Sequence, residues 1–170
     1  MIELTTERLV LKTPQAQDKW ALVEHLDNYE VTKWLSNVPY PYSVSDAEDW
    51  IQRVNNTIDD ERPSYQLSIF LSDALIGGVG LRHIESGFYE LGYWLSATHW
   101  GRGFATEAAT ELLRYGHRKL SIARIRAHCM KGNLASENVL RKLGFEVVGE
   151  VEDYSVSRKE SVASLRLSLP

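Results

Sequence analysis

The stretch His99-Trp100-Gly101-Arg102-Gly103-Phe104-Ala105-Thr106-Glu107-Ala108-Ala109 joins a glycine-rich turn directly to a helix, and the rest of the chain is arranged around it. Gly101 and Gly103 tolerate positive φ and, without a Cβ, let a ligand approach the backbone closely. A helix that begins near Gly103 leaves its first N–H groups without helical acceptors, and its dipole and Arg102 add positive charge there. These features favour a phosphate cradle, although the same spacing also fits a surface turn that caps a core helix.

Two common nucleotide-binding loops do not match this stretch. A Walker loop requires Lys-Ser or Lys-Thr after its second glycine, and the sequence has neither. The dinucleotide fingerprint requires glycine or alanine where Thr106 stands, together with an early βαβ unit, whereas the strand before this loop lies in mid-chain. A nucleotide-phosphate enzyme is therefore the weakest interpretation of the motif.

A third loop fits better. Trp100-Gly101-Arg102-Gly103-Phe104-Ala105 resembles the pyrophosphate loop of the GNAT superfamily of acyl-CoA-dependent N-acetyltransferases, which usually reads Gln/Arg-x-x-Gly-x-Gly/Ala. Gly103 and Ala105 match that pattern, and Trp100 replaces its first polar residue. The continuation Ala105-Thr106-Glu107-Ala108 resembles the RimJ/RimL branch of the family in particular.

Two further segments extend the resemblance over nearly the whole chain. Thr6-Glu7-Arg8-Leu9-Val10-Leu11 resembles the opening of RimJ/RimL-like proteins. Asn133-Leu134-Ala135-Ser136-Glu137-Asn138-Val139-Leu140-Arg141-Lys142-Leu143-Gly144-Phe145 resembles the Asn-x-x-Ser…Lys-x-Gly-Phe element that lies beside the pantetheine arm in GNAT proteins. Because two separate motifs occur in the family's order with a strand between them, the resemblance is specific.

Length and composition fit one globular domain, residues 1–170. The 170 residues are 44% hydrophobic and 25% charged, and the net charge of −4 gives no overall attraction to nucleic acid. No apolar run approaches the roughly 20 residues of a membrane span, and Glu3, Glu7 and Arg8 interrupt any N-terminal signal peptide. The single cysteine excludes an internal disulfide framework and fits a cytoplasmic location.

Hydrophobic periodicity and turn residues predict alternating strands and helices. The helices are expected at Ala16–Leu26 (Trp20 on its apolar face), Glu30–Leu35, a segment that opens at Ser45 with Ser43 or Ser45 as cap and extends to Ile58, Gly103–Lys119, and Ser136–Leu143 closed by Gly144. The strands are expected at Leu9–Leu11, Tyr65–Leu71, Ala74–His83, Phe88–Leu95, Ile122–Cys129, Phe145–Val151 and Arg158–Leu169. Loops are expected at Asn37–Ser43, Asp59–Ser64, Ser86-Gly87 and Glu152–Ser157. The resemblance implies an α/β (α+β) fold, a mixed and mostly antiparallel sheet of about seven strands with helices on both faces.

The resemblance also implies acetyl-CoA as the cofactor. The pyrophosphate would be held by the loop residues Gly101, Arg102, Gly103, Phe104, Ala105 and Thr106, and the pantetheine would lie beside Asn133 and Asn138. The strand that ends Gly92-Tyr93-Trp94-Leu95 resembles the family strand that splays from its neighbour, so that its free backbone groups would pair with pantetheine amides. An N–H near Trp94 or Leu95 would serve as an oxyanion donor, while core packing is the alternative role for Tyr93 and Trp94.

Two residues are candidates for proton transfer. Glu90 resembles a glutamate of the RimJ/RimL branch and is the candidate base, its alternative being a solvated strand carboxylate. Many relatives place a tyrosine acid where Leu140 stands, and some RimL-like members instead use the motif serine, here Ser136. The alternative for Ser136 is a helix cap. Cys129 is expected to be a passive thiol, and the histidines show no metal-binding spacing.

The leading function is transfer of an acetyl group from acetyl-CoA to a primary amine by direct attack in a ternary complex. A protein N-terminal α-amine is the first expected acceptor, since its pKa of about 7.7–8.0 demands less of a base than lysine, and a small amine is the second. Trp34 and Tyr40 would line the acceptor pocket, or serve only in packing. A degenerate acyl-CoA sensor is the alternative function, kept open by Leu140 and Trp100. We expect a monomer or homodimer, without a nucleic acid, membrane or metal partner.

Overall fold

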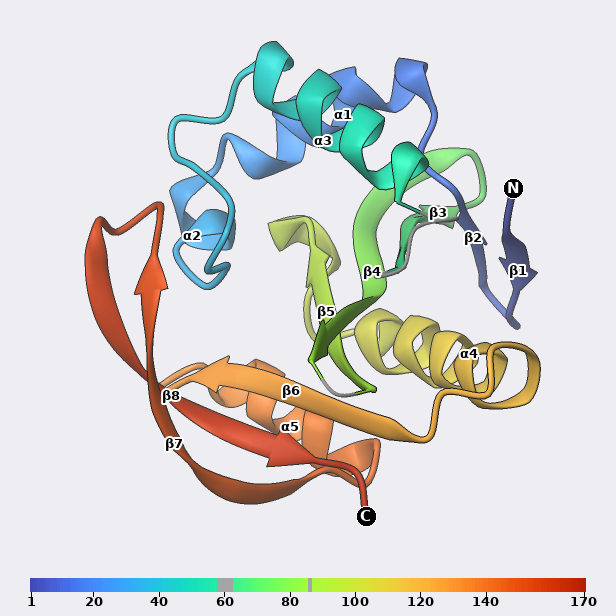
Figure 1. Ribbon diagram of the computed structural model, residues 1–170. Coiled ribbons are helices and arrows are strands. Elements are labelled where there is room, and N and C mark those ends of the chain that lie inside the picture. Colours follow the sequence, from blue (N-terminus) through green and yellow to red (C-terminus); the bar gives the residue numbers. More distant parts are fainter. Residues whose placement is uncertain (58–62, 86) are drawn as a thin grey trace.

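The computed structural model describes residues 1–57, 63–85 and 87–170, and these contain one eight-stranded sheet with helices on both faces (Figure 1). The strand order is β1-β2-β3-β4-β5-β6-β8-β7, and all neighbouring pairs are antiparallel except β5 and β6. The expected fold class is confirmed. The eighth strand is the short β1, which the sequence pattern did not indicate. Ile58, most of the expected Asp59–Ser64 turn and residue 86 lie outside the described residues.

The described elements have the following bounds. The strands are β1 (Glu3–Thr5), β2 (Leu9–Lys12), β3 (Ser64–Leu71), β4 (Ala74–Glu85), β5 (Phe88–Leu95), β6 (Arg124–Met130), β7 (Glu146–Ser155) and β8 (Glu160–Ser168). The helices are α1 (Lys19–Leu26), α2 (Tyr29–Thr32), α3 (Val44–Asn56), α4 (Phe104–Lys119) and α5 (Leu134–Lys142), with 3-10 turns at Ala16–Asp18 and Ala97–His99. None of the described helices is long and apolar enough to cross a membrane.

Helix α4 is the central element of one layer. Gly103 is its N-cap, with φ of 81°, so the chain enters the helix through a left-handed residue that glycine adopts without steric cost. Ala108, Ala109 and Leu112 are fully buried against the sheet. These small and branched residues recur at helical spacing, and they let α4 lie close to the strands that lead into its N-terminus.

Helices α1 and α3 cover the opposite face of the sheet. Leu22 and Leu26 of α1 and Ile51 of α3 form a second core with Leu75 of β4. The placement of Trp20 on the apolar face is wrong: its side chain is 63% exposed, because α1 is short and turns only Leu22 and Leu26 fully inward. Ser43, rather than Ser45, caps α3.

Helix α5 begins earlier than expected. Its N-cap is Asn133, whose side chain accepts a hydrogen bond from the backbone N–H of Ser136 at 3.2 Å. The helix-cap role for Ser136 is therefore wrong, and its hydroxyl is available for other contacts. Gly144, with φ of 90°, ends the helix as expected, and the N–H of Phe145 bonds to the carbonyl of Leu140 at 3.0 Å.

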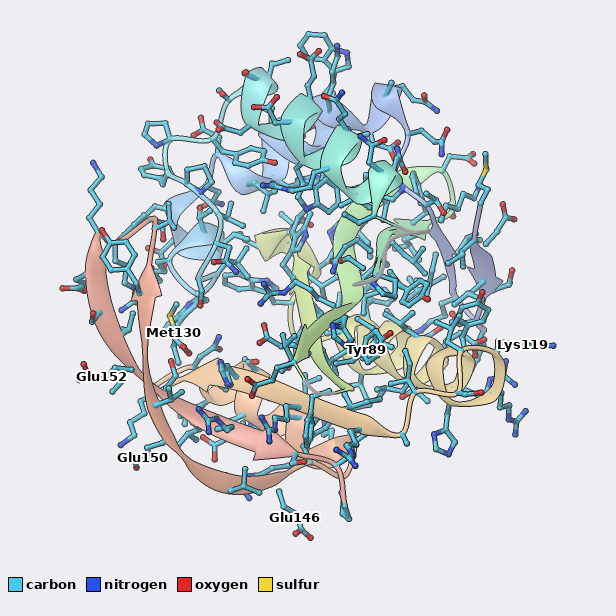
Figure 2. The ribbon with its side chains drawn as sticks, in the orientation of Figure 1. Tyr89, Lys119, Met130, Glu146, Glu150 and Glu152 are labelled. Carbon is cyan, nitrogen blue, oxygen red and sulfur yellow. The ribbon has the colours of Figure 1, made fainter. Side chains whose placement is uncertain are left out.

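Strands β7 and β8 form a long hairpin, and the loop expected at Glu152–Ser157 is wrong over its first four residues. β7 continues to Ser155, pairing Glu152 with Ala163 and Asp153 with Val162. The polar residues of this segment predicted a loop, but they belong to an edge strand with one solvated face. Glu146, Glu150 and Glu152 lie along the outer side of β7 (Figure 2). An edge strand of this kind carries polar residues without ending.

The tip of the β7–β8 hairpin docks on the segment after α2 (Figure 1). The N–H of Val156 donates to the carbonyl of Ser36 at 2.9 Å, and the Ser157 hydroxyl donates to the carbonyl of Thr32 at 3.0 Å. Arg158 Nε donates to the carbonyl of Lys33 at 2.8 Å. These contacts join the last part of the sheet to the helices that cover its first part.

Candidate active site

The sheet divides between β5 and β6. The two strands pair in parallel only over Phe88–Glu90 and Arg124–Arg126. Beyond these residues they no longer pair with each other: β5 continues to Leu95 beside β4, and β6 continues to Met130 beside β8. Figure 2 labels Tyr89, at the paired end of β5, and Met130, at the far end of β6. We call this opening the split; it provides free strand edges inside the fold, as expected for the strand that ends at Leu95.

The register shows which backbone groups of β5 face the split. The N–H of Ser96 donates to the carbonyl of Ile76 in β4 at 2.8 Å. Since antiparallel residues alternate in direction, Trp94 and Gly92 also direct their backbone groups to β4, whereas Leu91, Tyr93 and Leu95 direct theirs toward the split. Of the two expected oxyanion donors, the N–H of Leu95 is thus the one that points into the split.

Trp100 fixes the end of β5 to the glycine loop. Its indole N–H donates to the carbonyl of Leu95 at 2.9 Å. Trp100 therefore supplies a hydrogen-bond donor at the position where the GNAT loop usually has a polar side chain. His99 contributes a second contact at this corner, with Nδ1 lying 2.6 Å from the Ser96 hydroxyl. Burial, then the nearby positive charge of Arg102, lowers the pKa of His99.

The glycine loop has the conformation of an anion cradle. Gly101 and Gly103 both have positive φ, 70° and 81°, and no atom lies within 4 Å of where a Cβ on Gly101 would stand. The N–H groups of the first helical residues, Phe104, Ala105 and Thr106, have no acceptor within the helix and open toward the loop. The exposed guanidinium of Arg102 lies 4.9 Å from the centre of the Phe104 ring. The structure thus brings together the six expected loop residues.

A hydroxyl pair lies on the α5 side of the split. The Tyr93 hydroxyl is 2.9 Å from the Ser136 hydroxyl and 3.0 Å from the Ser136 carbonyl oxygen. Burial raises the pKa of Tyr93 far above its ordinary value, so its phenol stays protonated. Asn133 positions Ser136 through its backbone N–H, whereas Asn138 is exposed on the next turn of α5.

Glu90 lies on the opposite face of β5 from Tyr93, because the two residues are three positions apart and side chains on a strand alternate between its faces. Its Oε1 accepts from Arg82 of β4 at 3.1 Å, and in the register it stands beside Arg126 of β6. Gly92, two residues further on this face, is exposed with open space around it. A carboxylate therefore borders an open part of the split, away from the hydroxyl pair.

Sequence reasoning missed a second titratable pair on that face. His128 lies two residues beyond Arg126 on β6, and its Nδ1 is 3.1 Å from Oδ2 of Asp153 on β7. The two atoms are not aligned for a hydrogen bond, so Oδ2 has no donor among the described residues. The alternation His128-Cys129 indicated the direction of His128, but no local pattern could indicate its pairing with β7.

Cys129 points to the other face and is buried. Its Sγ lies 3.5 Å from the carbonyl oxygen of Asn133. Burial raises the pKa of its thiol, which keeps it protonated and weakly nucleophilic, in agreement with a passive role. Among the described residues no cluster of histidine, cysteine and carboxylate side chains is arranged to hold a metal ion.

The aromatic residues expected near the acceptor are spread more widely. Trp34 packs under Arg158 of the hairpin, 5.0 Å from ring centre to guanidinium carbon, and Tyr40 lies 5.2 Å from Tyr29 between ring centres. Trp94 packs against the second core with the α1–α3 layer. Trp34 thus packs at the hairpin contact, and Tyr40 packs on Tyr29 of α2.

Comparison with known proteins agrees with this geometry. The model of the acetyltransferase (GNAT) domain family matches residues 8–146. The "Uncharacterized N-acetyltransferase p20" of Bacillus licheniformis is 33% identical over 99% of this chain and 96% of its own. The chain belongs to the GNAT acetyltransferase family.

Other GNAT acetyltransferases extend the comparison to the RimJ/RimL branch. The [ribosomal protein uS5]-alanine N-acetyltransferase of Escherichia coli (strain K12) is 29% identical over 90% of this chain and 82% of its own. The crystal structure of Mycobacterium smegmatis RimJ in complex with CoA-disulfide superposes with a TM-score of 0.85 at 18% identity, covering 95% of this chain and 81% of that one. This structure establishes the shared fold, and the sequence relatives establish that the chain is an N-acetyltransferase.

Proposed function

We propose that this GNAT enzyme transfers the acetyl group of acetyl-CoA to a primary amine by direct attack in a ternary complex. The observation that carries the proposal is the split. The anion cradle lies at one end of it, a carboxylate borders one face and a hydroxyl pair lies on the other. A base on one face of β5 can take the proton of the attacking amine, and a separate acid on the other face can protonate the departing thiolate.

The residues present fit the cofactor. The cradle offers free N–H groups and the guanidinium of Arg102 to a pyrophosphate. Leu91 and Tyr93 offer backbone groups on the open edge of β5 to amide groups, and Leu95 offers its N–H, since its carbonyl accepts from Trp100. When bound, acetyl-CoA supplies an activated acetyl thioester. The complexes of structural neighbours with coenzyme A and, for the microcin C7 self-immunity acetyltransferase MccE, with acetyl-CoA and AMP support the same assignment.

Each group of this chain then has one task. Glu90 removes the proton from the attacking amine, directly or through water. The N–H of Leu95 stabilises the negative charge that develops on the carbonyl oxygen. Ser136 donates a proton to the departing sulfur, and the neutral phenol of Tyr93 holds the Ser136 hydroxyl in place.

The acceptor proposed first is the α-amine of a protein or peptide. An α-amine is partly neutral near pH 8, so it requires only a modest base. The activity for which the Escherichia coli relative is named, N-acetylation of an alanine of ribosomal protein uS5, supports this choice. A small amine is the second candidate.

Thiol release from acetyl-CoA tests the proposal. The enzyme is incubated with a panel of short peptides, free amino acids, polyamines and amino sugars, and coenzyme A binding is titrated in parallel. Release with peptides that have a free N-terminus, and not with their N-acetylated forms, is the expected result. Binding of coenzyme A without release by any acceptor would favour a sensor, and absence of binding would contradict the cradle.

Ser136→Ala is expected to lower kcat about tenfold at pH 7, less than the roughly 100-fold or more that a general acid typically contributes. The effect is modest because a thiol with a pKa of about 8.5 leaves readily as a thiolate. For the same reason the deficit shrinks as the pH rises to 9, which a pH profile of steady-state thiol release measures. Ser45→Ala, an exposed serine in the first turn of α3, is the control. An equal deficit at both pH values would contradict the acid role.

A further inference from the structure

The N-terminal segment Thr6-Glu7-Arg8 lies against the first turn of α4, far away in sequence. The Thr6 hydroxyl donates to Oε1 of Glu107 at 2.6 Å, and the backbone N–H of Arg8 donates to the same oxygen at 2.9 Å. Arg8 Nε and Nη2 lie 2.7 and 2.6 Å from Oε2. One carboxylate oxygen thus receives the hydroxyl of Thr6 and the backbone N–H of Arg8, and the other receives the guanidinium of Arg8, so both oxygens have charged or polar partners.

The same guanidinium also reaches the glycine loop. Arg8 Nη1 donates to the carbonyl oxygen of Arg102 at 3.0 Å. Its guanidinium carbon lies 4.4 Å from the centre of the Phe104 ring, on which Arg102 also packs. Nη2 stands 3.4 Å from where a Cβ on Gly103 would be. Arg8 therefore contacts Arg102 and Phe104, the residues on either side of Gly103 at the entrance of α4.

The charge balance at this entrance depends on Arg8. Glu107 lies within the first turn of the helix whose N-terminus forms the cradle. Although burial raises the pKa of the Glu107 carboxyl, the hydrogen bonds from Thr6 and Arg8 and the charge of Arg8 outweigh this and lower it. Glu107 is consequently ionised, and without Arg8 its charge would repel any anion in the cradle.

We propose that Arg8 and Glu107 form a clamp that holds the loop Arg102–Phe104 in its anion-receiving conformation, with Arg8 as the positioning residue for the phosphates of coenzyme A. The proposal rests on the proposed function for the identity of the anion. The Thr6–Arg8 segment takes no part in the acetyl transfer itself, and the clamp gives it a role in holding the glycine loop in position.

Binding of coenzyme A, measured by titration calorimetry, tests the clamp. Arg8→Ala is expected to raise the Kd and the KM for acetyl-CoA by about tenfold, with kcat within about twofold, because a charge-assisted contact made equally in ground and transition states is lost. The Kd of Arg8→Lys for coenzyme A should lie between those of wild type and Arg8→Ala, since lysine keeps the positive charge but lacks the several N–H donors of the guanidinium. The double variant Arg8→Ala/Glu107→Gln should bind more tightly than Arg8→Ala, because the unpaired carboxylate is also removed.

Trypsin supplies a second readout that does not depend on the cofactor. The clamp holds the carbonyl oxygen of the Arg102–Gly103 peptide bond, so Arg8→Ala should be cleaved there severalfold faster, as followed by mass spectrometry of the native, folded protein. Arg114→Ala, which breaks the Arg114–Glu111 pair on the same helix, is the matched control and should change neither readout. Thermal unfolding confirms that each variant is folded.

The outcomes separate the clamp from the function. Wild-type affinity and wild-type cleavage in Arg8→Ala would overturn the clamp. A double variant that binds no better than Arg8→Ala would overturn the charge-neutralising part and reduce the pair to a structural contact. If wild type itself does not bind coenzyme A, the proposed function and the cofactor role of Arg8 both fail, while faster cleavage of Arg8→Ala would still support loop positioning.

Discussion

Replacement of Glu90 by glutamine is expected to lower kcat/KM for amine acetylation by about 100-fold at pH 7, within the range attributed to a general base. Glutamine keeps the size of the side chain and can still bond to Arg82, but it cannot accept the proton of the amine. The deficit should shrink toward pH 9, because an α-amine then loses its proton to solvent before it enters the site. Steady-state thiol release with a peptide acceptor at both pH values measures this change.

Glu85→Gln is the matched control for that variant. Glu85 lies on the adjacent strand β4 and pairs with Arg126 at 3.4 Å, but its side chain is 71% exposed. Loss of this ion pair in Glu85→Gln should leave kcat/KM for amine acetylation within about twofold of wild type, since exposed ion pairs contribute little to stability. A wild-type rate in Glu90→Gln would exclude Glu90 as the base, and the His128–Asp153 pair on the same side of the split would be tested next.

Phe104→Ala is expected to lower the free energy of unfolding by about 3–5 kcal/mol, the range found for large core truncations. Phe104 is only 2% exposed although it is the first residue of α4, so its removal leaves a cavity between the helix and the sheet. The variant should also bind coenzyme A more weakly, because Arg8 and Arg102 both pack on the ring. Urea unfolding followed by tryptophan fluorescence measures the stability.

Phe88→Ala provides the comparison for Phe104. Its ring is half-buried at the start of β5, and the guanidinium carbon of Arg126 lies 3.6 Å from the ring centre. Its truncation should therefore lower the free energy of unfolding clearly less than Phe104→Ala does. If both variants lost the same free energy of unfolding, Phe104 would not be the tightly packed residue at the entrance of α4 that its burial indicates.

The elements with strong local patterns were predictable from the sequence. Phe88–Leu95 matches β5 at both ends, and α4 begins directly after Gly103, because a glycine with positive φ followed by an apolar helical repeat has few alternative structures. β1 was missed because three residues carry no periodicity. The hairpin was misjudged at Glu152 and Asp153, where an edge strand and a polar loop have the same composition.

The site was predictable where its residues are close in sequence. The loop from Gly101 to Thr106 has the expected glycine turn and helix start because its geometry is local. The Tyr93–Ser136 contact depends on where α5 packs against β5, and the Arg8–Glu107 pair joins residues 99 positions apart. Neither leaves a periodic signal. Only the opening resemblance at Thr6–Leu11 pointed to that segment, without giving its physical reason.

The strand order β6-β8-β7 has a consequence for biosynthesis. β8 lies between β6 and β7, yet it is translated after both, so β7 has no neighbouring strand, and β6 has only β5, until β8 has left the ribosome. The wall of the split that β6 forms, and the hairpin tip that reaches Ser36, are both completed only when β8 is inserted between β6 and β7. A nascent chain therefore completes this wall of the split only after β8 has been made, and chains interrupted before β8 should be inactive and open to proteolysis.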